Sequence, residues 1–575
     1  MLGQMIYIQP LSLARKDDHV MRHKHMKRSM ALIMAVVLML SLAACTGSKN
    51  SSNKPNSPPA DNKPENTQNE VKLNPDEPGW KLDTSPVELS WFVGASWYGR
   101  SWGESLNSKY ITEKTGVKVN IEVPSGEANE HITLMMTSGK LPDLITMGSW
   151  ETAVKKLWEG DHVYALNELA DQYDPYFFKV AGDGTLKWYK QENGNTYGIP
   201  NDSYSPNLMH ETGMTAANQT FLVRKDLYED MGSPDLSTPE GFLNALQLLK
   251  DQYSEYKGQP ISPFFAQGNV PYGMTEYLQN LLAVPHEKDG KVYDRITDPD
   301  YLTWLKTFRT AYERGLINVD FLVDSDTQVE EKTNNARYFM MVREWTGMTA
   351  VNPMLAASSN PDSYYIAVDG PKNSKGDSAK LFPGNMDGWM VTMISKSCEN
   401  PERAIRFLTY LASEEGQKDL FLGQEGETWE MVDGKPQLKA DMAQLLDSDI
   451  EKLEKEYGIM DTYWMMRNPV IVDQWRPEKA SVIKQMADFA NAQADIDGGI
   501  YKGLDPLGDS DVAVNWARIS QNWEEVMPEL ITAKDEAAFD KIFESFLARR
   551  TSYGYDQVME YRQTELDARK AKMAE

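Results

Sequence analysis

Residues 87–147 restrict the fold of this chain more than any other part of its sequence. Three segments are apolar or alternate apolar with polar side chains, as strands do, and they lie at 87–93, 117–123 and 144–147. Two segments between them have helical composition, 105–114 and 128–137, and each is followed by a glycine that suits a helix C-terminus. Alternation of strands and helices is typical of parallel sheets, so we predict an α/β fold.

A basic flank followed by a short apolar run indicates an export signal. Residues 21–28 hold four basic and no acidic side chains, and nothing in residues 30–42 is more polar than a serine. This pattern is that of a secretory signal, and the run is shorter than the roughly 20 residues that cross a bilayer. We predict that residues 1–44 are a signal peptide. Two acidic side chains make the first twenty residues unsuitable, so we expect translation to begin at Met21 or Met26.

Residues 42–45, Leu-Ala-Ala-Cys, resemble the lipobox of bacterial lipoproteins. In a lipobox the cysteine thiol accepts a diacylglyceryl group before the chain is cut in front of it; the alternative for Cys45 is an ordinary buried thiol. Two or more acyl chains hold a protein stably on a membrane. We therefore predict lipid attachment, including palmitate, at Cys45. Residues 45–84 are rich in Ser, Asn and Pro, and we predict a flexible linker with a reach of roughly 30 Å.

The overall charge excludes some partners. The chain has a net charge of −26 at pH 7, which repels nucleic acid and anionic headgroups and favours a neutral or cationic ligand. Its only cysteines are Cys45 and Cys398, so lipidation of the first leaves no intramolecular disulfide. The hydrophobic core alone must then stabilise the fold.

Catalytic signatures are missing from the sequence. It contains no GxSxG, GxGxxG or P-loop motif, and its histidines after residue 45 stand singly rather than at zinc-ligand spacing. We therefore predict no catalytic residue, no metal and no cofactor. A carboxylate pair for glycoside hydrolysis stays open, because the spacing of acidic residues along the chain does not test it.

Aromatic side chains stand beside amides and carboxylates in segments with loop composition. Flat aromatics suit the C–H faces of sugars, while Asp, Asn and Arg suit the hydroxyl groups. Ligands of open α/β sheets bind at the carboxyl ends of strands, where several of these segments fall. The candidate ligand-binding residues are Trp97, Trp102, Trp150, Asn201, Asp202, Tyr204, Arg343, Trp345, Asp387 and Trp475. For any single tryptophan a core position is an equal alternative, and we assign Trp91 and Trp389 to the core because they lie in strand-like runs.

An ordered set of short motifs resembles family 1 extracellular solute-binding proteins of ABC importers. The motifs include Thr-Gly-Val-Lys-Val at 115–119, Gly-Lys-Leu-Pro-Asp at 139–143, Tyr-Gly-Ile-Pro at 197–200 and Asn-Pro-Glu-Arg-Ala at 400–404. The resemblance runs from residue 86 to about residue 570 and is nearest to the large LplA-like branch of Gram-positive bacteria. No single motif is diagnostic, but the order and the lipobox together are specific.

The resemblance implies a two-lobed periplasmic-binding-protein-like fold of type II, with α/β lobes joined by hinge segments. Lobe 1 would comprise residues 85–200 and, after the chain returns, 381–426. Lobe 2 would comprise residues 201–380 and then 427–575, which include a helical insertion. Lobes joined in this way close on a ligand by a hinge movement.

The resemblance also assigns roles to several candidates. It places Trp97, Trp102 and Trp150 in ligand-binding loops, Asn201 and Asp202 at the hinge, and Trp345 where an aromatic ring stacks on sugar. Many relatives carry an acidic calcium loop after the helix that corresponds to residues 239–249. Residues 250–260 lack its spaced aspartates, so we predict no calcium there.

The function that these features predict is that of a lipid-anchored receptor on the extracellular face of the cell membrane. It would capture an oligosaccharide as a monomer and deliver it to an ABC permease by lobe closure, without covalent chemistry. A negatively charged uronide would require an arginine such as Arg343 to face the ligand. The alternatives are a surface polysaccharide-degrading enzyme and a peptide-binding or sensory lipoprotein.

Overall fold

The computed structural model describes residues 73–268, 270–322, 324–384, 386–477 and 481–574. The predicted signal peptide, Cys45 and most of the predicted linker lie outside these residues. Within the described part, no helix is both long and apolar enough to cross a bilayer.

The first sheet confirms the three predicted strands. Its order is β2-β1-β3-β13-β4, with β1 at Val87–Val93, β2 at Val117–Glu122, β3 at Leu144–Gly148, β13 at Met390–Ile394 and β4 at Ile199–Pro200. The strands β1, β2 and β3 are parallel, whereas β13 is antiparallel to both of its neighbours. The register places Met390 opposite Gly148, so the start of β13 lies beside the end of β3.

Side-chain alternation along β1 divides the first lobe into two cores. Trp91 and Val93 are buried with helices α5 (Leu166–Tyr173) and α15 (Pro401–Ala412). Phe92, between them, is buried on the other side with helices α3 (Ala128–Ser138) and α4 (Thr152–Glu159). The remaining helices of this lobe are α2 (Leu106–Thr115), α6 (Phe177–Ala181), α7 (Asp183–Tyr189) and α16 (Glu414–Leu422). The first sheet is therefore covered on both faces, as a parallel sheet requires.

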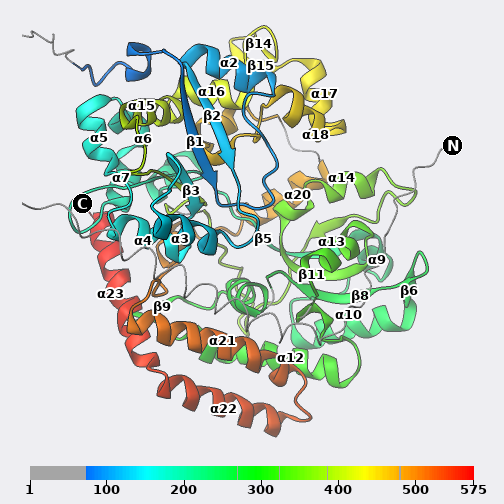
Figure 1. The fold of residues 1–575 in the computed structure, drawn as a ribbon. Helices are drawn as coiled ribbons and strands as arrows, with labels where there is room; N and C mark the ends of the chain where they lie inside the picture. The colour runs from blue at the N-terminus through cyan, green and yellow to red at the C-terminus, as the bar shows by residue number, and fades with distance from the viewer. Residues whose placement is uncertain (1–72, 269, 323, 385, 478–480, 575) are drawn as a thin grey trace, which may run out of the picture. The chain divides into compact units, whose positions relative to one another are not determined.

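The second sheet has the order β12-β5-β11-β8 and belongs to the second lobe (Figure 1). Its strands are β5 (Gln219–Arg224), β8 (Ser262–Ala266), β11 (Tyr338–Glu344) and β12 (Tyr365–Ala367). One large apolar cluster joins this sheet to five helices. Two of them lie between its strands in the sequence, α10 (Pro239–Gln252) and α12 (Pro299–Glu313), and three follow its last strand, α20 (Ser481–Asn491), α21 (Asp511–Ile531) and α22 (Glu536–Ser552). The molecule thus consists of two α/β lobes, each with its own sheet and core.

Residues 429–475 pack differently from the predicted boundary, which placed everything after residue 426 in the second lobe. This insertion comprises β14 (Trp429–Val432), β15 (Lys435–Leu438), α17 (Ala440–Ser448), α18 (Ile450–Lys452), the π-helical turn η6 (Leu453–Tyr457), the 3-10 turn η7 (Trp464–Met466) and α19 (Pro469–Val472). It contacts α2, α15, α16 and β13 of the first lobe. Trp464 and Met465 are buried in the first-lobe core, and the chain returns to the second lobe only with α20.

The C-terminal helix α23 (Tyr555–Ala574) contacts both lobes. It packs against α21 and α22 of the second lobe and against α7 of the first (Figure 1). Near its end, Lys572 Nζ donates hydrogen bonds of 3.1 Å to the carbonyl oxygens of Trp188 and Lys190. The lobes are therefore linked by helix contacts as well as by the crossing segments.

Candidate functional site

Three tryptophans from distant parts of the chain stack at the edge of the first sheet where β1 and β3 end. Trp97 follows β1, Trp389 precedes β13 and Trp464 belongs to the insertion. The ring of Trp97 lies 6.0 Å from that of Trp389 at an interplanar angle of 10°, and 5.8 Å from that of Trp464 at 27°. Trp97 is 65% exposed, whereas Trp464 is buried. We call Trp97, Trp389 and Trp464 the tryptophan platform.

Residues of the insertion hold the loop that carries Trp97 in place. The Tyr98 hydroxyl donates a hydrogen bond of 2.8 Å to the carbonyl oxygen of Thr462, and its ring meets the Trp464 ring edge-on at 5.6 Å. Arg100 forms an ion pair with Glu454 of η6. These contacts hold the loop after β1 against the insertion, so that an aromatic face of the exposed Trp97 is presented on a rigid support.

A second exposed tryptophan lies at the same sheet edge. Trp150, 51% exposed, follows β3, and its indole ring lies so close to Gly148 that a Cβ there would collide with it. The next residue, Glu151, is within electrostatic reach of Tyr272 in the second lobe. Burial raises the pKa of Tyr272, and the charges of Glu276 and Glu151 raise it further. Tyr272 is 50% exposed.

Carboxylates of the second lobe lie close to Tyr272. The Tyr277 hydroxyl donates a hydrogen bond of 2.6 Å to Glu344 Oε1 at the end of β11. Gln219 Nε2, at the start of β5, donates one of 3.3 Å to Glu276 Oε1. Burial raises the pKa of Glu276, while the positive charge of Lys502 opposes this shift. Aromatic faces on one lobe and hydrogen-bond acceptors on the other form a surface suited to hydroxyl-rich, partly apolar molecules.

Two of the predicted ligand contacts are core residues instead. Trp102 is buried in the first-lobe core, where its ring packs against Phe407 and Tyr463 and its Nε1 donates a hydrogen bond of 2.8 Å to Thr112 Oγ1. Trp475 is buried in the core of the insertion. Both predictions are corrected, because these two rings are buried within the protein.

Three further candidates from the hinge region are also buried or engaged. Tyr204 is buried beside a small apolar cavity that Trp188 and Met386 line. Asn201 is fully buried, and the Asp202 carboxylate is bound by Arg467 at 2.6 Å. The side chains of these three residues therefore pack or bind within the protein.

The remaining candidates differ in their surroundings. Trp345 follows Glu344 at the end of β11 and donates from Nε1 to the carbonyl oxygen of Ala217 at 2.9 Å. Asp387 accepts a hydrogen bond of 2.5 Å from Trp188 Nε1. The Arg343 guanidinium donates from Nη1 to Thr333 Oγ1 at 3.0 Å, inside the second lobe, and burial lowers its pKa. Arg343 is thus partly buried and bound to Thr333 of its own lobe.

Among the predicted residues, Trp97 and Trp150 are exposed at the edge of the first sheet, whereas Trp389, Trp464 and Tyr272 were not among the candidates. Trp389 is only partly buried, although its position before a strand indicated a core residue. Trp464 reaches the platform through the packing of the insertion, which no local pattern encodes. An aromatic pair, Tyr463 and Trp464, in a segment with loop composition was the available signal.

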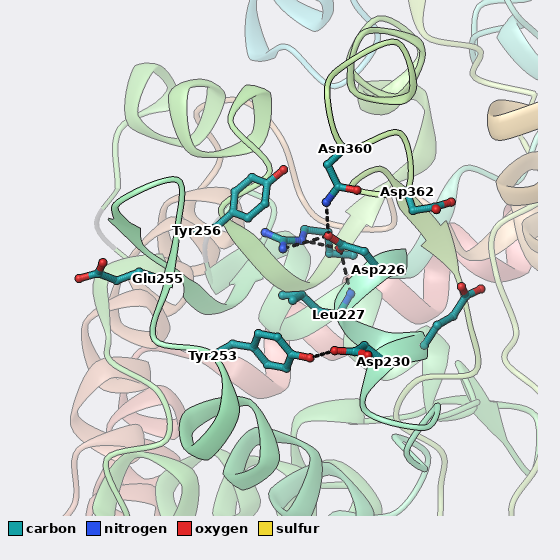
Figure 2. Close-up of a pocket in the computed structure, with 10 residues that line it drawn as sticks. Asp226, Leu227, Asp230, Tyr253, Glu255, Tyr256, Asn360 and Asp362 are labelled. Carbon is teal, nitrogen blue, oxygen red and sulfur yellow. Dashed lines mark hydrogen bonds and ion pairs between the residues drawn. The ribbon is translucent and has the colours of Figure 1, made fainter.

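An open hollow of about 620 Å³ lies beside Arg224 at the end of β5, and Asp226, Tyr256 and Asn360 are among its lining residues (Figure 2). The Arg224 side chain at its base is buried and donates to both carboxylate oxygens of Asp226, at 2.7 and 3.2 Å. Its guanidinium lies 4.0 Å from the Tyr256 ring centroid, and Asn360 Nδ2 donates to Asp226 at 2.9 Å. The contact between Arg224 and Tyr256 joins the hairpin of β6 (Glu255–Tyr256) and β7 (Gln259–Pro260) to the sheet. Among the described residues, no three His, Cys, Asp or Glu side chains are grouped as ligands of one metal ion.

Comparison with known proteins identifies the family. Residues 99–418 match the model of the bacterial extracellular solute-binding proteins, which covers more than half of the chain. The chain belongs to this family, and it is therefore a solute-binding protein. The matched family and the similar solved structures are binding proteins and not enzymes.

Individual relatives are distant in sequence. The chain is 22% identical over 351 residues to the lipoprotein LipO of Bacillus subtilis; the match covers 58% of this chain and 65% of LipO. The alginate-binding protein AlgQ2 is similar in structure, with a TM-score of 0.57, 18% identity and coverage of 84% of this chain and 99% of that one. A solute-binding protein of Bifidobacterium longum infantis that binds HMO has a TM-score of 0.61, 14% identity and coverage of 84% and 99%. FusA of S. pneumoniae, solved with kestose, has a TM-score of 0.59, 15% identity and coverage of 84% and 100%. These likenesses show the two-lobed fold.

Proposed function

We propose that this chain is the lipid-anchored, extracellular binding component of an ABC importer and that it captures oligosaccharides. The observation that carries the proposal is the tryptophan platform, because Trp97 presents an exposed aromatic face on a rigid stack at the edge of the first sheet. Sugars offer apolar C–H faces to such rings. The bound sugar would pass to the permease when the two lobes close.

The carboxylates near Trp150 and Tyr272 support a sugar rather than an anion. Glu151 of the first lobe and Glu276 and Glu344 of the second lobe can accept hydrogen bonds from hydroxyl groups and repel carboxylates. The net charge of −26 supports the same choice. We therefore favour a neutral or amine-bearing oligosaccharide over a uronide.

Delivery by closure needs a ligand that binds the closed form better than the open form, because only differential affinity shifts the population. Aromatics on the first lobe and carboxylates on the second suit this requirement, since a sugar that contacts both would favour closure. We place the crossings of the chain between the lobes at the predicted boundaries, near residues 200 and 381.

The lipid anchor at Cys45 is part of the same proposal. A family of extracellular proteins and similarity to a lipoprotein support it. In the bacterium, Cys45→Ala should release the protein from the membrane fraction into the medium and abolish incorporation of labelled palmitate. Unchanged membrane retention and labelling would refute lipidation at Cys45.

A thermal-shift screen of neutral, amino-bearing and acidic oligosaccharides, with peptides as the alternative, tests the ligand class. A ligand present at about 100 times its Kd should add about 2.7 kcal/mol to the free energy of unfolding. Stabilisation by sugars, confirmed by calorimetric titration, is expected of the folded protein with residues 1–45 removed. Stabilisation by peptides alone would overturn the proposal in favour of a peptide-binding lipoprotein.

A further inference from the structure

Asn201 makes hydrogen bonds with every polar group it has. It is fully buried, and its carboxamide accepts at Oδ1 from the Met390 backbone N–H at 2.7 Å. Its Nδ2 donates to the carbonyl oxygen of Trp464 at 3.1 Å. Its own backbone N–H donates to the Met390 carbonyl at 2.9 Å, and its carbonyl accepts from the Trp389 N–H at 3.1 Å. One residue therefore binds the backbone of two members of the tryptophan platform.

We propose that Asn201 is a positioning residue that sets the geometry of the tryptophan platform without touching the ligand. The importance of this role for sugar binding rests on the proposed function. Trp389 and Trp464 come from segments far apart in the sequence, and the Asn201 carboxamide joins the backbone of Trp464 to that of Met390, the residue after Trp389. The ring of Trp97 stacks on both of them, so its orientation depends on their separation.

Asparagine suits this position because its side chain carries an acceptor and a donor at once. Aspartate has the same shape and retains the acceptor for Met390, but it cannot donate to the Trp464 carbonyl. The approach of the strands also requires Gly388, since a Cβ there would collide with the Asn201 carbonyl oxygen. Both features are local to the contact between β4 and the segment that leads into β13.

The next residue extends the connection from the crossing segment to the insertion. Asp202 has a positive φ of 50°, and its backbone N–H donates to the Arg467 carbonyl at 3.0 Å. The Arg467 side chain donates from Nε to Asp202 Oδ1 and from Nη1 to Asp461 Oδ1, both at 2.7 Å. Burial raises the pKa of Asp202, and the charge of Arg467 counteracts that rise. The segment that carries Trp464 is thus bonded to the first crossing through Arg467, whose side chain Asp461 also binds.

The decisive variant is Asn201→Asp, with Asn352→Asp as its matched control. Asn352 is also fully buried, accepts from the Tyr365 N–H at 3.0 Å, and donates to the carbonyls of Tyr365 at 2.8 Å and Val482 at 3.2 Å. It lies in the second lobe, away from the platform. Both variants lose a buried donor in the same chemical way, so a general loss of stability affects both.

Two readouts separate positioning from a merely structural role. The near-ultraviolet circular dichroism of the ligand-free protein reports the coupling of the stacked indoles, and titration with a binding oligosaccharide reports affinity. In Asn201→Asp, the tryptophan bands should weaken and the Kd should rise about tenfold. In Asn352→Asp, both should stay at wild-type values. Equal behaviour of the two variants in both readouts would overturn the proposal.

A variant on the other side of the contact keeps the proposal testable if Asn201→Asp does not fold. Trp464→Phe preserves an apolar ring in the core, and it should weaken the same tryptophan bands and the affinity. Unchanged bands in Trp464→Phe would refute the platform itself and the proposal with it. Because the dichroism is recorded without sugar, a failure of sugar binding by the wild-type protein would refute the proposed function while leaving the positioning role to be decided by the bands.

Discussion

Trp97 lies nearly parallel to Trp389, with an interplanar angle of 10° and 6.0 Å between the ring centroids. Trp389 and Trp464 together support one side of the Trp97 indole, which is itself largely exposed. A large exposed aromatic ring is costly to keep in water unless it serves binding, and rigid support lowers the entropy lost when a ligand stacks on it.

Replacement of Trp97 should separate binding from stability. We expect Trp97→Ala to raise the Kd for a bound oligosaccharide by about 30-fold, as for an aromatic hot-spot residue, while the free energy of unfolding changes by about 1 kcal/mol or less. Calorimetric titration and chemical denaturation measure the two quantities. Tyr312→Ala, at an exposed ring on α12 of the second lobe, serves as the control and should leave the Kd unchanged. Equal Kd values for Trp97→Ala and wild type would contradict ligand contact at Trp97.

The buried ion pair of the second lobe should respond strongly to loss of one partner. Asp226→Asn leaves the buried Arg224 guanidinium without its counter-charge, so we expect a loss of about 3 kcal/mol in the free energy of unfolding. The exposed pair of Lys118 and Glu88 gives the comparison, since Glu88→Gln should cost about 0.5 kcal/mol or less. Urea denaturation measures both. A cost for Asp226→Asn no larger than that for Glu88→Gln would contradict the view that the buried Arg224 depends on Asp226 for its counter-charge.

The raised pKa of Asp174 predicts a specific dependence of stability on pH. Burial raises its pKa to about 6, above the value of 3.8 expected in the unfolded chain, although the Gly79 N–H donates to it at 3.1 Å. The folded protein therefore binds the proton more tightly, and the contribution of Asp174 to stability is greatest below pH 4 and is lost as the pH rises to 6. Asp174→Asn removes this loss and should be more stable than wild type by about 2 kcal/mol at pH 7.

The stability difference between Asp174→Asn and wild type is measured by denaturation at pH 4, 5, 6 and 7. It should grow with pH over this interval. A difference that is constant with pH would contradict a raised pKa at Asp174.

Cys398 should be inert in the folded protein. It is buried in the first-lobe core, and burial together with the charge of Asp143 raises its pKa to about 12, so little thiolate exists at neutral pH. In the protein with residues 1–45 removed it is the only cysteine, and iodoacetamide should label it only after unfolding. Mass spectrometry across a urea series should then follow unfolding of the first lobe. Rapid labelling in native buffer would indicate an accessible thiol.

Local patterns predicted the first sheet well because its strands are defined within a few residues of sequence. The alternation in residues 87–93 places Trp91 and Phe92 on opposite faces, and the structure buries them in separate cores. The position of β13 beside β3 and the packing of residues 429–475 on the first lobe depend on contacts across hundreds of residues. Periodicity carries no information about such partners, which is why the boundary at residue 426 differed.

The burial of each candidate residue depends on its packing and not on its residue type. Trp97 and Trp150 are exposed, as a binding role requires, while Trp102 has the same composition of neighbours in sequence and is buried. Asn201 was chosen as a ligand contact because asparagine binds sugar hydroxyls. In the structure its carboxamide binds the chain instead, a distinction that depends on where Trp464 and Met390 meet it in space.

The attachment of α23 to both lobes has a practical consequence for measuring the movement of the protein. Because Lys572 binds carbonyl oxygens of α7 and the segment after it, a fluorescent protein or affinity tag joined to the end of α23 would strain these contacts and distort the motion being recorded. Dyes placed through engineered cysteines at the exposed Leu134 and Tyr312 would report the distance between the lobes with that helix left intact.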